Sequence, residues 1–110
     1  MAKEQAQEYK YREGQIIDEL KKYIDSTYGQ HYSTGKLQTI DVWEALGIEE
    51  ESCQSNVIKY AMRYGKKGGH NKADLLKILH YTILWWHYTQ QEGNTKWVCY
   101  ILILQRLNLI

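Results

Sequence analysis

Polar and cationic side chains recur at helical spacing between residues 56 and 63. Asn56 is followed by Lys59, Tyr60 and Arg63 at steps of three, four and seven residues, which places all four on one helical face. A guanidinium donates paired, planar hydrogen bonds to phosphate oxygens, and an ammonium adds a point charge. This face therefore predicts a binding site for a phosphate-bearing ligand, with Asn56 in reach of a base or sugar edge.

Residues 66–72 predict an exposed, flexible and cationic loop. They include Lys66, Lys67 and two glycines, which let a backbone approach a ligand closely. Asn71 then has the character of a helix N-cap, with Asp74 three residues later as in a capping box. Since a helix N-terminus carries unpaired N–H groups and a partial positive charge, an anion near Asn71 would meet backbone donors as well as lysines.

A second helical face is expected to complete the site. Asp74, Lys77 and Tyr81 line up on the helix that follows the loop, so two faces and the loop converge. The tyrosines that could stack on a base are Tyr60, Tyr64 and Tyr81. Asp74 is the candidate catalytic residue, able to orient a hydroxyl or hold magnesium with bound phosphate, but helix capping is the favoured interpretation. For the lysines, a solvated surface is the competing interpretation.

Other motifs are weaker. Metal-ligand spacing is absent around the four histidines, His31, His70, His80 and His87, so no metal site is predicted. Cys53 and Cys99 lack a triad pattern and are expected to be buried thiols in a reducing cytosol. A Walker-type kinase is excluded because no GxxxxGK motif followed by Ser or Thr is present.

Hydrophobic periodicity predicts an all-α protein, a small bundle of about four helices with an apolar C-terminal segment. The predicted helices begin near Gln15, Thr39, Ser52 and Asn71. Val42, Trp43 and Leu46 are expected to face inward on the second helix. The tail at 94–110 contains a run of aromatic and β-branched residues, for which a helix is favoured over a strand.

Length and composition favour one cytoplasmic domain over residues 1–110, with 1–14 as a frayed helix or a tail. Fourteen cations face 13 anions, and the formal charge of +1 argues against bulk attraction to nucleic acid or membrane. Ten tyrosines and four tryptophans accompany no phenylalanine, so nearly every aromatic ring carries a polar group. Together with the apolar tail, this surplus predicts a homo-oligomer.

An ordered series of residues also resembles a known family. The series Asn-Lys-Tyr-Arg-Lys-Gly-Asp-Leu-Lys-Tyr is formed by Asn56, Lys59, Tyr60, Arg63, Lys66, Gly68, Asp74, Leu75, Lys77 and Tyr81. It is similar to a small phage-borne family of unknown function that includes the nucleotide kinase of lytic podoviruses, and His31–Tyr32 and Gln38–Val42 fit the same pattern. The match covers 31–88, about half of the chain. Ser55 and Thr39 depart from it, where the family usually has Gly and Pro.

The resemblance implies a phage-derived, nucleotide-binding protein of the bacterial host cytoplasm, with a non-Walker nucleoside monophosphate kinase or phosphotransferase as the implied activity. Magnesium would arrive with the bound nucleotide. Two alternatives stay open: an oligomeric protein that sequesters a nucleotide without catalysis, and a binder of single-stranded nucleic acid. Arg63→Ala is expected to abolish ligand binding and to leave the fold intact.

Overall fold

The structure, a computed structural model, describes residues 7–29, 37–90, 101–102 and 104–109. These residues form helices and connecting loops and contain no strand, which confirms the all-α prediction. The chain divides into two compact units, 1–38 and 39–110. In the described part of the tail, residues 101–102 and 104–106 are helical, in line with the favoured prediction. Whether 1–110 behaves as one domain stays a prediction.

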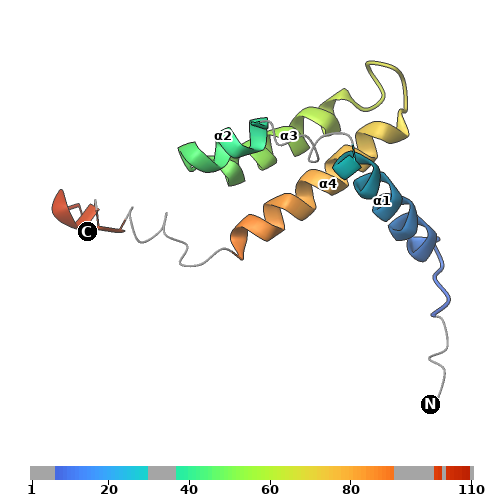
Figure 1. Ribbon diagram of the computed structural model, residues 1–110, viewed down its shortest axis with the longest axis horizontal. Coiled ribbons are helices and arrows are strands. Elements are labelled where there is room, and N and C mark those ends of the chain that lie inside the picture. Colours follow the sequence, from blue (N-terminus) through green and yellow to red (C-terminus); the bar gives the residue numbers. More distant parts are fainter. Residues whose placement is uncertain (1–6, 30–36, 91–100, 103, 110) are drawn as a thin grey trace, which may run out of the picture. The chain divides into compact units, whose positions relative to one another are not determined.

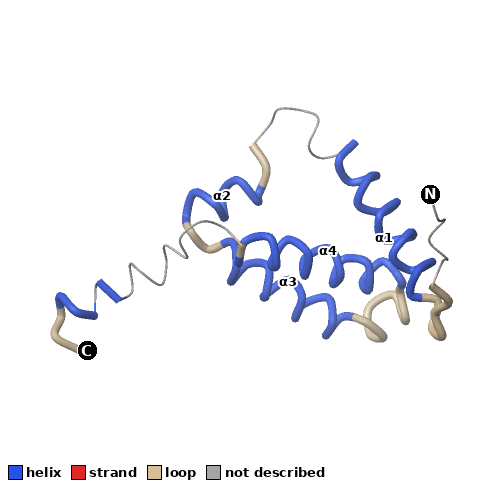
Figure 2. The backbone as a smooth tube through the Cα atoms, turned by 90° about the horizontal axis from the view of Figure 1, so that it is seen from below, coloured by secondary structure: helices blue, strands red, loops and turns tan. Residues whose placement is uncertain are grey.

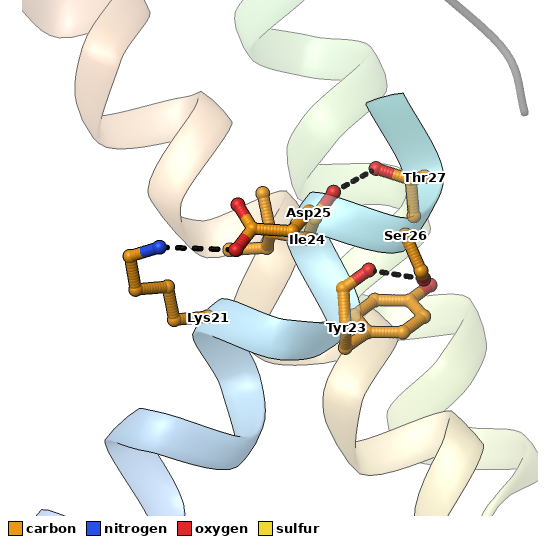
Figure 3. A network of polar contacts seen from close by, with 6 residues as sticks. All are labelled: Lys21, Tyr23, Ile24, Asp25, Ser26 and Thr27. Atoms are coloured by element: carbon orange, nitrogen blue, oxygen red, sulfur yellow. Dashed lines mark hydrogen bonds and ion pairs between the residues drawn. The ribbon is translucent and has the colours of Figure 1, made fainter. Parts of the chain in front are cut away.

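The helix of the first unit within the described residues is α1 (Glu13–Thr27). Lys21 and Asp25 form an exposed ion pair of 3.0 Å one turn apart (Figure 3). Near the helix end, the Ser26 hydroxyl donates to the Tyr23 carbonyl at 2.6 Å, and the Thr27 hydroxyl to the Ile24 carbonyl at 2.7 Å. These hydroxyls add bonds to carbonyls of the last turns, where a helix runs short of backbone donors.

The second unit is built on a hairpin of two antiparallel helices, α3 (Glu49–Arg63) and α4 (Lys72–Thr89), which lie side by side in Figures 1 and 2. Tyr60 and Tyr81 stack between them, with ring centroids 6.0 Å apart and an interplanar angle of 11°. Cys53, Tyr60 and Tyr88 are the buried hydrophobic residues among those described, so the core is a narrow seam along the hairpin.

The short helix α2 (Thr39–Leu46) packs against the hairpin through Trp43, whose ring centroid lies 6.3 Å from that of Tyr81. Trp43 is half-buried, as expected. The expected inward position of Val42 and Leu46 is wrong, because these side chains are 39% and 67% exposed. A helix of eight residues turns only a narrow face toward one neighbour, and here the Trp43 ring fills that contact.

The start of α3 also differs from the prediction at Ser52. The helix begins at Glu49, so three consecutive acids, Glu49 to Glu51, occupy its first turn. Acidic side chains are stabilising there because the helix N-terminus carries a partial positive charge. The charge pattern, and not the apolar stripe, decides where this helix begins.

The loop between α3 and α4 is exposed, as predicted, and it is held by its own backbone. Gly65 N–H donates to the Gly69 carbonyl at 2.9 Å, and Lys66 N–H donates to the Arg63 carbonyl at 2.9 Å. Gly65 has a φ of +85°, a conformation that favours glycine, and an added Cβ would lie 3.3 Å from the His70 ring. The loop is thus a defined turn that fixes how α3 delivers the chain to α4.

None of the helices in the described ranges is both long and apolar enough to cross a membrane.

Candidate phosphate-binding site

Two ammonium groups from different helices meet on one tyrosine ring. Lys59 Nζ from α3 lies 5.1 Å from the centroid of the Tyr60 ring, and Lys77 Nζ from α4 lies 4.9 Å from it. Each contact is in the range of a cation–π interaction. Tyr60 is only 9% exposed and also stacks on Tyr81, so its ring is a fixed support for the two lysines. Little of it is left for a base to stack on.

Next to this ring, α3 and α4 are joined by an ion pair. Arg63 Nε lies 3.5 Å from Asp74 Oδ1, with 34% of the arginine side chain and 2% of the aspartate side chain exposed. The geometry is incomplete, because Arg63 Nε and Asp74 Oδ2 are buried atoms without a hydrogen-bond partner. The pair therefore joins the end of α3 to the first turn of α4 and leaves hydrogen-bonding capacity unused.

We call the group formed by Lys59, Arg63, Lys77, Asp74 and Tyr60 the cationic cluster. It contains three cations and one carboxylate, and its residues come from both helices of the hairpin. Contacts between the two helical faces of the prediction are present at these residues, whereas their convergence with the loop on one cleft stays a prediction.

The role of Asp74 differs from the favoured interpretation, which was helix capping. Asn71 is the N-cap, as predicted, since its Oδ1 accepts a hydrogen bond of 2.9 Å from Ala73 N–H. The reciprocal bond of a capping box is missing, because Asn71 N–H donates to the Gly69 carbonyl instead. The side chain of Asp74 turns toward Arg63, 1% exposed as a residue. Only the tertiary contact with α3 could reveal this role.

The remaining predicted residues lie around the cluster with weaker connections to it. Asn56 is half-buried one turn before Lys59, and its amide donates to the Ser52 carbonyl at 2.8 Å. Lys66 and Lys67 are exposed on the loop, where their backbone N–H groups bond to the Arg63 carbonyl. These two lysines add positive charge near the cluster without a described contact to the Tyr60 ring.

At the opposite end of the hairpin lies a second polar contact that the sequence did not single out. The Tyr88 hydroxyl, on a residue 8% exposed, donates to Glu44 Oε1 at 2.7 Å. Burial and this hydrogen bond both raise the pKa of Tyr88. Cys53 is fully buried as predicted, and burial, with smaller contributions from Glu49 and Glu50, raises the pKa of its thiol to about 11. Cys99 lies outside the described residues.

The histidines divide between the described and the undescribed parts of the chain. His70 packs against Tyr64 with ring centroids 5.2 Å apart, and partial burial lowers the pKa of His80. His31 lies outside the described residues. Within the described ranges, no group of three or more His, Cys, Asp or Glu residues is arranged to hold a metal ion.

Residues 26–82 match the model of a family described as a protein of unknown function, DUF3310. This match covers more than half of the chain and includes the whole cationic cluster, and the chain belongs to this family. No match was found among curated proteins or among solved structures.

Proposed function

We propose that this chain binds a nucleotide, or another small phosphate-bearing molecule, at the cationic cluster. The observation that carries the proposal is that Lys59 and Lys77 contact the same Tyr60 ring, with Arg63 one turn after Lys59 on α3 and its side chain 34% exposed. An anion bound beside this ring is attracted by each of these cations. Phosphate is the biological anion that best matches a guanidinium flanked by ammonium groups.

The loop and the start of α4 add to the attraction for an anion. Lys66 and Lys67 stand exposed on the turn, and α4 begins immediately after it with the partial positive charge of a helix N-terminus. Asn56, one turn before Lys59 on α3, is placed to contact a part of the ligand beyond its phosphates. The resemblance to phage nucleotide kinases suggests that this part is a nucleoside, and the bacterial cytoplasm is the compartment that we propose.

Binding is favoured over phosphoryl transfer by the position of Asp74. A catalytic base must come within hydrogen-bond reach of the acceptor hydroxyl, and Asp74 is 1% exposed and directed at Arg63. We therefore assign Asp74 the task of positioning Arg63. Magnesium, where it takes part, would enter on the phosphates of the nucleotide.

The test is calorimetry of the full chain with nucleoside mono-, di- and triphosphates, with and without magnesium. Lys59→Ala and Lys77→Ala should each weaken binding about tenfold or more, since each removes one charge-assisted contact to the ligand. Lys21→Ala is the matched control, because Lys21 is an exposed lysine on α1 and should leave the affinity unchanged. Equal affinity in all three variants would remove the cluster as the binding site.

Arg63→Ala is a poor probe of binding, although the sequence suggested it. The substitution leaves Asp74 buried without its cation, so loss of binding and loss of fold would be confounded. Arg63→Lys keeps the charge and removes the planar donor geometry. We expect it to weaken binding of phosphate while preserving the helical circular dichroism spectrum.

Two further measurements separate the alternatives. Formation of nucleoside diphosphate from ATP and a nucleoside monophosphate would establish a kinase, whereas binding without turnover would establish sequestration. A steep decrease of oligonucleotide affinity with salt would favour single-stranded nucleic acid as the ligand. The formal charge of +1 argues against that last outcome.

A further inference from the structure

Helix α4 is apolar on two opposite faces, and α3 covers only one of them. The face toward α3 is identified by the contacts of Asp74, Lys77 and Tyr81 with that helix. On the other side lie four large apolar side chains at steps of four, four and three residues, each more than a third exposed: Leu75, Leu79, Ile83 and Trp86. Positions at these steps share one helical face, which we call the outer α4 stripe.

The outer side of α3 is an ordinary solvent-facing surface and serves as a comparison for the outer α4 stripe. Its outer side carries Ile58 and Met62, both exposed, but they stand among exposed polar residues, Glu51, Gln54 and Ser55. A helix with one apolar face and one polar face is stable at a surface, whereas a helix that is apolar on both sides is normally covered on both. Among the described residues of this unit, the outer α4 stripe is therefore an apolar face that remains largely uncovered.

We propose that the occupant is a second copy of this chain, packed antiparallel through the outer α4 stripe about a twofold axis near the middle of the stripe. This inference is independent of the proposed function. A face that meets itself across a twofold axis needs only to be self-complementary, and a uniform row of Leu, Ile and Trp satisfies this condition.

The direction of packing follows from the charges at the two ends of the hairpin. The loop end carries Lys66, Lys67 and Lys72, and the other end carries Glu49 to Glu51 at the start of α3. An antiparallel arrangement brings the cationic end of each copy toward the acidic end of the other, whereas a parallel one places like charges together. Complementary charge fixes orientation and excludes the repulsive alternative.

Sedimentation equilibrium of the full chain over a range of concentrations tests the association. The wild type should be a dimer or a larger assembly built from dimers, and Leu79→Glu and Ile83→Glu should each shift it toward monomer. Met62→Glu is the matched control, since Met62 is 63% exposed on the outer side of α3. All variants should keep the helical circular dichroism spectrum.

The proposal is overturned if the wild type stays monomeric at every concentration. This holds whether or not another part of the chain covers the stripe. An assembly that is unaffected by Leu79→Glu and Ile83→Glu also overturns it. Dissociation by Met62→Glu as well would show that the outer side of α3 is the interface instead.

Disulfide trapping tests the orientation in a Cys99→Ser background, where the remaining Cys53 is fully buried. Around an axis midway between Leu75 and Trp86, the two copies of residue 79 lie close together, and the two copies of residue 75 are about 16 Å apart along the helix. Leu79→Cys should therefore form a dimeric disulfide and Leu75→Cys should not, because disulfides need Cα atoms within about 7 Å. Equal trapping of both variants would indicate parallel packing and overturn the antiparallel proposal.

Discussion

Each end of the α3–α4 hairpin contains a buried side chain with an oxygen atom. The two side chains differ in how completely their hydrogen-bonding groups are paired. At the α2 end, the Tyr88 hydroxyl donates a well-formed bond of 2.7 Å to Glu44. At the loop end, Arg63 and Asp74 lie 3.5 Å apart, and a buried atom of each has no hydrogen-bond partner. The first contact is complete within the chain, whereas the second is not.

Buried side-chain atoms without a hydrogen bond also occur at the α2 end of the hairpin, so the gathering of cations is what sets the loop end apart. Buried polar groups in proteins are nearly always hydrogen-bonded, and those that are not commonly mark sites where a ligand, ion or water completes the network. The loop end also brings Lys59 and Lys77 to one ring, which concentrates positive charge there. We therefore expect changes at the α2 end to affect stability alone, and changes at the loop end to affect both stability and ligand binding.

The largest effect on stability should come from Arg63→Met. It leaves the carboxylate of Asp74 buried without a counter-charge, which costs about 3 kcal/mol or more in the free energy of unfolding. Urea denaturation monitored by circular dichroism measures the loss. The double variant Arg63→Met with Asp74→Leu should recover most of it, because an apolar pair removes the buried charge. A single variant as stable as the wild type would show that the ion pair contributes nothing.

Tyr88→Phe should have a smaller effect of about 1 kcal/mol, the usual net contribution of one hydrogen bond. Glu44 is exposed and can exchange the lost donor for water, so no charge is left buried. The same denaturation experiment gives the value, and calorimetry should find nucleotide affinity unchanged. Weaker binding in Tyr88→Phe would contradict the separation of the two ends.

The smallest effect should come from the protonation of His80. Burial lowers its pKa, so the folded state favours the neutral ring. A base with a lowered pKa contributes stability that is present above its unfolded value near 6.5 and is lost as the pH falls. Stability should therefore decrease from pH 7 toward pH 5, and His80→Gln should reduce the slope. An unchanged slope would assign the pH dependence to other groups.

Local signals in the sequence were sufficient for most of the helices. Gly65 marks the end of α3 and Asn71 the start of α4, because positive φ and capping depend on the residue itself. The start of α3 was predicted three residues too late, because the apolar stripe begins after the acids that stabilise the first turn. Val42 and Leu46 were wrongly predicted to face inward. Helical spacing shows which residues share a face, but it does not show which element that face packs against.

In the candidate site, too, the sequence predicted the local features and missed those that depend on tertiary contacts. Spacing placed Asn56, Lys59, Tyr60 and Arg63 on one face of α3, and the structure agrees, because the helical repeat is a local property. Spacing could not show that Asp74 would bind Arg63 and not cap α4, since that choice depends on how close α3 comes to the first turn of α4. It also could not show that Tyr60 would be covered by Tyr81 and two lysines.

The sequence by itself determined an all-helical chain and where its cations gather, because helix formation, capping and charge density depend on residues close together in the chain. Only the tertiary structure decided which side chains are buried and which remain open. Burial depends on the neighbour that each face meets, and the chain order does not specify that neighbour. The buried aspartate beside Arg63 and the open apolar face of α4 both arise at this second level.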